Sequence, residues 1–157
     1  MDALTWLEST SVVQWMVGYL WAYPVLLTGH AIGLAVTVGV ALLLDLRLLG
    51  LYPTLPLAAL GRLLGLAWIG IVLNTVTGLL IFATQATMYV TNVPFLVKIV
   101  FVVLGGISLV ATQRILRRDA DRWESTGQVS SLGRRLALGS ILFWTIAVAT
   151  GRLIAYA

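Results

Sequence analysis

One histidine and two cations fall inside apolar stretches of this sequence, at similar expected depths in a membrane. His30 is the only histidine of the chain and lies six residues after Pro24, within an uncharged stretch. Lys98 lies six residues after Asn92, and Arg152 lies five residues before the last residue. At about 1.5 Å rise per helical residue, all three would lie roughly 8–9 Å below one membrane surface. Ionisable side chains at such depths are costly and mark functional hypotheses.

This layer of side chains, which Thr77 of another apolar stretch is expected to join, has the chemistry of an anion or cofactor site. Two cations can pair with a small anion or with the carboxylates of a haem. The imidazole of His30 can be an axial haem ligand, with Met88 or Lys98 as the other. The alternative is that Lys98 and Arg152 extend outward to lipid phosphates. His30 would then only bond to a carbonyl of a neighbouring helix.

Met16, Met88 and His30 form a candidate set for a metal. All three are expected on the same side of the membrane, and copper(I) accepts thioether and imidazole ligands. No spacing motif joins the three, and methionines also fill gaps in helical cores. The chain has no cysteine, which excludes disulfides, thiolate metal sites and iron–sulfur clusters. The cofactor stays unknown at this point, with haem and copper both open.

Charged residues gather at the opposite side of the expected membrane. Asp45, Arg47, Arg62 and Arg114 are predicted at one depth, where Asp45 would pair with Arg62 or Arg114. We expect this ion-pair cluster to anchor helix ends at the interface. The sequence contains no serine-hydrolase, phosphate-loop or dinucleotide motif. No catalytic residue is therefore assigned, and an enzymatic function is not favoured.

The stretches that carry these residues are long enough to cross a membrane. The chain of 157 residues is 60% hydrophobic and only 10% charged, and its mean hydropathy is +1.00. A hydrocarbon core of about 30 Å needs about 20 apolar residues per helix. The sequence predicts an all-α, integral membrane up-down-up-down four-helix bundle, forming one transmembrane domain over 1–157. The four spans are expected at about 24–49, 56–85, 93–117 and 131–156.

The residues ahead of the first span are crowded with tryptophan and tyrosine, which is typical of a membrane–water interface. We predict an N-terminal interfacial helix over about 9–22, capped by Ser11. The alternative is a first turn continuous with the first span and kinked at Pro24. Asn92 is expected to cap the third span, and either Ser130 or Ser131 the fourth.

Basic residues are distributed unevenly between the two ends of the expected bundle. Eight arginines lie near the connections between spans one and two and between spans three and four. Only Lys98 and Arg152 lie toward the other end. The positive-inside rule then predicts a multi-pass protein of the bacterial inner membrane, with both termini in the periplasm. The start of the chain lacks a basic n-region, so no removable signal peptide is expected.

Several blocks of the sequence resemble an uncharacterised family of small bacterial four-helix membrane proteins, itself distantly similar to copper-resistance-D-type membrane domains. The blocks are Gly29–Gly33, Asp45–Gly50, Thr77–Phe82 and Gly151–Tyr156, together with Lys98. The resemblance covers most of the chain and implies a four-helix membrane fold. Relatives often carry a second histidine late in the third span, where this chain has Ala-Thr-Gln at 111–113. A two-histidine cofactor site is therefore not expected here.

Three function classes follow from these observations. The first is a membrane binding or transport-associated module with a polar periplasmic-side site for a metal, haem or small anion. The second is a haem-bearing electron-transfer membrane subunit, and the third is a structural or partner-docking subunit without a cofactor. The expected partners are the lipid bilayer, a periplasmic protein or a second copy of the chain, since rows of small residues allow close helix approach. The basic charge is explained by topology, so nucleic acid is not an expected partner.

Overall fold

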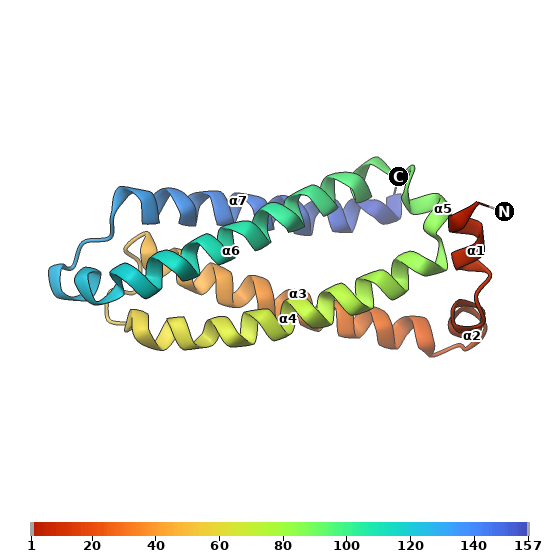
Figure 1. Ribbon diagram of the computed structural model, residues 1–157, viewed down its shortest axis with the longest axis horizontal. Helices are drawn as coiled ribbons and strands as arrows, with labels where there is room; N and C mark the ends of the chain where they lie inside the picture. Colours follow the sequence, from red (N-terminus) through yellow and green to blue (C-terminus); the bar gives the residue numbers. More distant parts are fainter. Residues whose placement is uncertain (1, 157) are drawn as a thin grey trace.

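The computed structural model describes residues 2–156, which are 86% helix and contain no strand. Four long helices lie side by side along the molecule (Figure 1). The all-helical prediction is confirmed, and each of the four is long and apolar enough to cross a membrane, as a multi-pass membrane protein requires. They are α3 (Ala22–Leu48), α4 (Leu57–Thr84), α6 (Val93–Thr126) and α7 (Ser131–Leu153).

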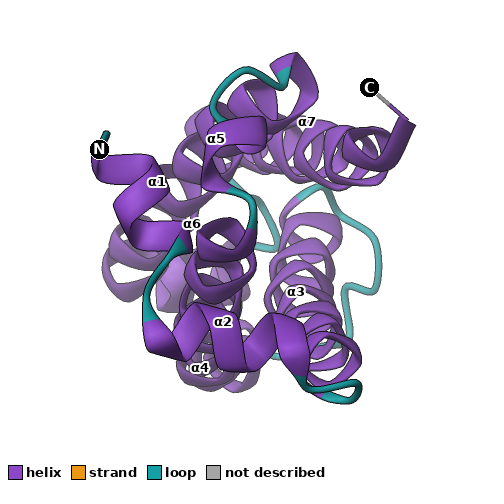
Figure 2. Ribbon diagram, turned by 90° about the vertical axis from the view of Figure 1, so that its right-hand side faces the viewer, coloured by secondary structure: helices purple, strands orange, loops and turns teal. Residues whose placement is uncertain are grey.

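The short elements gather at one end of the four long helices. We call it the terminal end, and we call the opposite end, with the α3–α4 and α6–α7 connections, the basic end (Figure 1). Figure 2 looks onto the terminal end and shows α2 lying across the ends of the longer helices. The short elements are α1 (Ala3–Glu8), α2 (Ser11–Gly18), α5 (Ala86–Tyr89) and the 3-10 helix η1 (Ile154–Tyr156).

The N-terminal segment differs from its prediction. Two short helices, α1 and α2, replace the single helix expected over 9–22. Ser11 is not the cap of α2: Thr10 holds that position, and its side chain makes no capping bond. Instead, the Thr10 hydroxyl donates to the carbonyl of Leu7 (2.8 Å), which ends the preceding helix. A serine and threonine cluster can thus end one helix as readily as start the next.

The two other predicted caps are confirmed. Asn92 accepts a hydrogen bond from the backbone N–H of Phe95 (2.9 Å) at the start of α6. Ser130 accepts one from the N–H of Gly133 (3.2 Å) at the start of α7. Helix α6 continues beyond the apolar stretch expected to end at 117. Its polar extension buries Trp123, which is 4% exposed, and ends at Gly127 with a left-handed φ of 68°.

The long helices pack as two hairpins. Gly33 of α3 and Gly70 of α4 bring the first pair of backbones together, since a Cβ on Gly33 would lie 2.8 Å from the nitrogen of Asn74. In the second hairpin, a Cβ on Gly105 of α6 would lie 2.8 Å from the indole of Trp144 in α7. These close approaches are the packing that small residues allow between helices in lipid.

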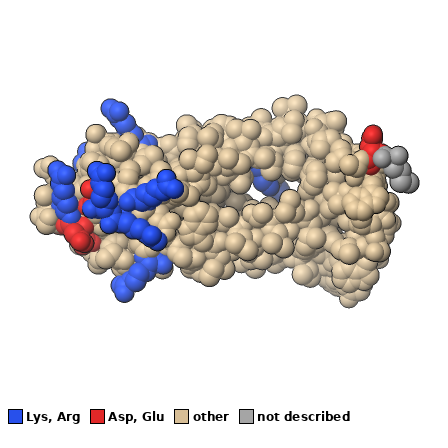
Figure 3. Space-filling view, viewed as in Figure 1, with Lys and Arg blue, Asp and Glu red and all other residues tan. Residues whose placement is uncertain are grey.

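Leucines fill the core mainly in the half nearer the basic end, where Leu48, Leu57 and Leu64 are almost fully buried. The half nearer the terminal end is packed less tightly. Figure 3 shows a hollow between the helices there, with basic atoms visible inside it. The same view shows most Lys and Arg side chains gathered at the basic end. The hairpins therefore join firmly at one end and leave room for a polar site toward the other.

Candidate functional site

His30 lies at the centre of a hydrogen-bond network in the half of the molecule nearer the terminal end. Its Nδ1 lies 3.1 Å from the hydroxyl oxygen of Thr77. That hydroxyl donates its own proton to the carbonyl of Leu73 (2.6 Å), so it can only accept from the ring. The imidazole therefore carries its proton on Nδ1. The Asn74 side chain donates to the backbone carbonyl of His30 (2.8 Å), which fixes the helix beneath the ring.

Lys98 completes the network from the other hairpin. Its Nζ lies 3.4 Å from Nε2 of His30. An ammonium group can only donate, so Nε2 accepts, and this matches the proton on Nδ1. The bond joins α6 to α3 across the two hairpins. We call His30, Thr77 and Lys98 the polar layer.

Two glycines make room for these side chains. A Cβ on Gly78 would lie 3.1 Å from Cε1 of His30, so a larger residue would push against the ring. A Cβ on Gly151 would lie 3.4 Å from both Cδ and Cε of Lys98. The lysine stem thus runs along bare backbone of α7 to reach the imidazole. Counting residues along the helix already places Gly78 beside Thr77, at the depth of the layer, but only the structure shows that Gly78 and Gly151 border the side chains of His30 and Lys98.

An aromatic cluster lies one helical turn from the polar layer, toward the terminal end. The ring centroids of Phe82 and Phe95 are 5.6 Å apart, and those of Tyr89 and Phe95 are 5.2 Å apart. Phe82 follows Gly78 by four residues, and Phe95 precedes Lys98 by three, so each shares a helix face with the site. Along α4 and α6, the rings of Phe82 and Phe95 therefore lie between the polar layer and the terminal end.

No carboxylate faces Lys98 among residues 2–156. The one ion pair in this described range joins Arg118 and Asp119 at the basic end, 3.4 Å apart. Glu8 accepts from Thr87, and Glu124 accepts from the N–H of Leu57. Lys98 is half-buried and uses one of its three donors on His30. Two donors of a partly desolvated cation are therefore left for another partner.

The structure does not unite all of the residues that the sequence grouped at this end. Arg152 is exposed on α7, and among the described residues it makes no hydrogen bond or ion pair. It follows Gly151, whose bare face borders Lys98, so the arginine side chain points to another side of the helix. Met16 is buried in α2 (4% exposed), while Met88 in α5 is 46% exposed.

His30 offers no free ring nitrogen to a haem iron or a copper ion. Both ring nitrogens already bond to protein, Nδ1 to Thr77 and Nε2 to Lys98. Residues 2–156 contain no group of three His, Cys, Asp or Glu side chains that could hold a metal. A metal at Nε2 would also face the ammonium group of Lys98, whose charge repels a cation.

The expected ion-pair cluster at the basic end is not formed in the described chain. Asp45 is 2% exposed and points into the bundle, where its carboxyl meets the hydroxyl of Ser140. Its Oδ2 has no hydrogen-bond partner. Arg47 instead donates from Nε to the carbonyl of Leu55 (2.8 Å). Arg62 and Arg114 are exposed. Asp45, Arg62 and Arg114 were expected at one depth in the membrane. Asp45 forms no ion pair with these arginines because its side chain faces the core while theirs face outward.

Comparison with protein-family models, with curated proteins and with solved structures finds no match to this chain. The geometry of the polar layer is the feature of the molecule that points most directly to a function.

Proposed function

We propose that this protein is a binding module of the bacterial inner membrane, and that its polar layer binds a small monovalent anion such as a carboxylate. The observation that carries the proposal is the state of Lys98. It is a half-buried cation inside a membrane-spanning helix, with no carboxylate partner among the described residues and two donors unused by His30. A desolvated charge without a counter-ion is costly, so an anion would stabilise it.

The charge of the polar layer favours a monovalent ligand. His30 is neutral in its network, because Nδ1 donates to Thr77 while Nε2 accepts from Lys98. The layer therefore carries one positive charge, which one carboxylate or halide would balance. A divalent anion would leave one negative charge uncompensated in a region of low dielectric constant.

The orientation is part of the proposal. The basic side chains at the basic end support a cytoplasmic location for the α3–α4 and α6–α7 connections. The termini and the polar layer would then lie on the periplasmic side, with α2 as an interfacial helix. A reporter fused after residue 125 should read cytoplasmic, and one fused after residue 157 periplasmic. The reverse pair would place the polar layer on the cytoplasmic side. We also propose that the chain belongs to the uncharacterised bacterial family that its sequence resembles.

An anion screen tests the binding function. The detergent-purified protein is heated at constant ionic strength while sodium gluconate, whose bulky polyhydroxy anion is much larger than the small anions proposed, is replaced by sodium chloride or sodium acetate. We expect chloride or acetate to raise the unfolding temperature of the wild type in a saturable manner. Lys98→Met should abolish the rise, while Arg152→Met removes the same charge at the same end and should retain it. Equal responses in the two variants, or none in the wild type, would refute the proposal.

A further inference from the structure

A second feature of the molecule, a groove between α4 and α6, lies on its outer surface away from the polar layer. Its volume is about 380 Å³. One wall is the face of α6 that runs from Val103 through Gly106 to Arg114, and the other wall is Trp68 of α4. The indole of Trp68 donates to the side chain of Gln113 (3.3 Å), which holds this wall in place.

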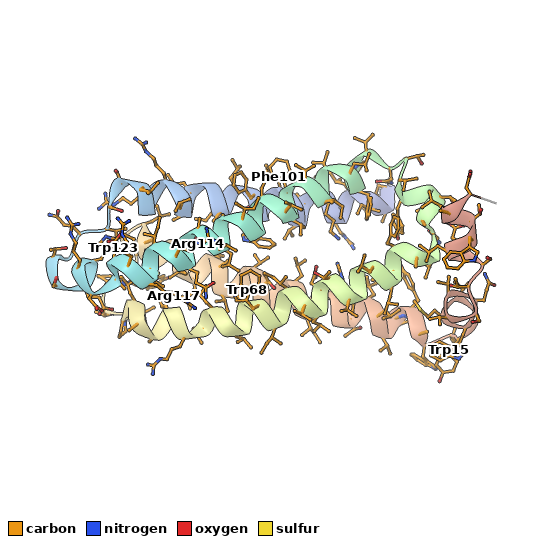
Figure 4. All side chains as sticks on the ribbon, in the orientation of Figure 1. Trp15, Trp68, Phe101, Arg114, Arg117 and Trp123 are labelled. Atoms are coloured by element: carbon orange, nitrogen blue, oxygen red, sulfur yellow. The ribbon has the colours of Figure 1, made fainter. Side chains whose placement is uncertain are left out.

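The groove is apolar along its length and positively charged at one end. Val103 and Ile107 are 55% and 59% exposed, so this face of α6 is not covered by the rest of the chain. Arg114 is exposed at the groove end nearer the basic end, and Arg117 follows one turn later. Figure 4 shows Trp68, Arg114 and Arg117 close together between the ribbons of α4 and α6, in the half nearer the basic end. Neither arginine has an ion-pair partner within residues 2–156.

The dimensions of the groove fit a lipid chain. At about 1.5 Å rise per residue, the face from Val103 to Arg114 is about 16 Å long. One leaflet of a hydrocarbon core about 30 Å thick is about 15 Å deep. An extended acyl chain of one leaflet therefore matches the groove in length, and Arg114 at the groove end, unpaired within the described chain, suits the phosphate to which such a chain is attached.

Gly106 deepens the middle of the groove. A Cβ at this position would meet no atom within 4 Å, so the space above the glycine is open. By contrast, a Cβ on the adjacent Gly105 would meet the indole of Trp144 at 2.8 Å. The two glycines thus have different surroundings: Gly105 packs α6 against α7, and Gly106 faces outward into the groove.

We propose that this groove binds one anionic phospholipid, with an acyl chain lying over Gly106 between α4 and α6 and the phosphate held by Arg114. A guanidinium group binds phosphate through paired hydrogen bonds, which favours arginine at this position. The negative headgroup adds attraction that a zwitterionic lipid lacks. With the orientation proposed above, the lipid belongs to the cytoplasmic leaflet. The site is independent of Lys98 and of anion binding there.

Native mass spectrometry with defined lipids tests this proposal. The wild type, released from detergent, should retain one molecule of dioleoyl phosphatidylglycerol and release dioleoyl phosphatidylcholine. Arg114→Gln should weaken retention of phosphatidylglycerol about fivefold to tenfold. Arg62→Gln is the matched control, because Arg62 is an exposed arginine near the same end and does not line the groove. It should retain the lipid as the wild type does.

A second variant tests the apolar half of the site. Gly106→Leu should fold, because its side chain enters open space, and should lose the retained phosphatidylglycerol by filling the groove. Its helical content and unfolding temperature, measured in the same detergent, check the fold. Equal retention of the two lipids, equal effects of the two arginine variants, or unchanged retention in Gly106→Leu would overturn the proposal. Dissociation of a wild-type dimer by Gly106→Leu would assign the groove to a second copy and overturn it too.

Discussion

The ammonium nitrogen of Lys98 lies 3.4 Å from Nε2 of His30, and this bond joins the α6–α7 hairpin to the α3–α4 hairpin. The lysine stem passes along Gly151, and the imidazole rests beside Gly78. The two side chains can therefore meet because each lies against a glycine, which has no side chain to block it. The arrangement places one positive charge within a membrane-spanning bundle without a carboxylate in the described chain to neutralise it.

The close contact between α3 and α4 predicts the first mutational result. Gly33→Ala places a Cβ 2.8 Å from the backbone nitrogen of Asn74 and should separate the helices. We expect a loss of about 1–3 kcal/mol in the free energy of unfolding, as for other overpacked sites. Gly39→Ala is the control on the same helix, where a Cβ meets nothing within 4 Å. Unfolding in SDS, followed by circular dichroism, compares them. Equal stability of the two variants would contradict the close contact.

Glu124 of α6 caps the start of α4, a helix distant in the sequence. Its carboxylate accepts from the N–H of Leu57, the first residue of α4, which is fully buried. Glu124→Ala would leave that N–H without a partner, at a cost of about 1 kcal/mol. Hydrogen exchange should quicken in the first turn of α4. Asp121→Ala removes an exposed carboxylate from the same extension of α6 and should leave exchange unchanged. If both variants quicken exchange equally, charge rather than capping is responsible.

Glu8 predicts a pH dependence at the terminal end. The backbone N–H of Thr87, and then its hydroxyl, donate to this carboxylate and hold the pKa of Glu8 below its usual value. Its contribution to docking α1 on α5 is therefore present above the ordinary glutamate pKa of about 4.3. The contribution is lost as the pH falls through the lower, folded-state pKa.

The amide resonance of Thr87 reports this titration by NMR. Its chemical shift should change with a midpoint below about 4.3 in the wild type. Glu8→Gln should abolish the transition, and Asp2→Asn, which removes another carboxylate near α1, should leave it in place. A wild-type midpoint at or above the ordinary value would show that the Thr87 contacts do not persist in solution.

The burial of Asp45 predicts that this position tolerates substitution by asparagine. Its carboxyl is buried against Ser140, and Oδ2 has no partner. Burying an unpaired carboxylate is more costly than burying an amide of the same shape. Asp45→Asn should therefore leave the unfolding free energy unchanged or raise it, whereas Asp119→Asn, at the exposed ion pair, should change it little. A large loss for Asp45→Asn in SDS unfolding would show that the negative charge itself is required.

The fold was largely predictable because lipid imposes simple requirements. Long apolar stretches must form helices in a bilayer, and Asn92 and Ser130 mark helix starts through their own side chains. The ends of α1 and α2 were harder to predict. Ser9, Thr10 and Ser11 all have the chemistry of a cap, and the choice among them depends on contacts made elsewhere in the fold.

The sequence predicted the depth of the candidate site residues in the membrane, but not the direction in which their side chains point. Counting residues from helix ends placed His30, Thr77 and Lys98 in one layer, and their side chains do meet. The same counting added Arg152, which faces away, and grouped Asp45 with arginines that it does not contact. Depth follows from position along a helix, whereas direction depends on how neighbouring helices rotate and pack.

The most direct test of the account is ¹⁵N NMR of protein labelled only at histidine, since His30 is the only histidine in the chain. We expect a neutral ring with its proton on Nδ1, and an Nε2 resonance that shifts on replacing gluconate by chloride or acetate. Lys98→Met should abolish that shift, and Arg152→Met should retain it. A proton on Nε2, or a resonance that neither anion moves in the wild type, would contradict an anion site built on Lys98 and His30.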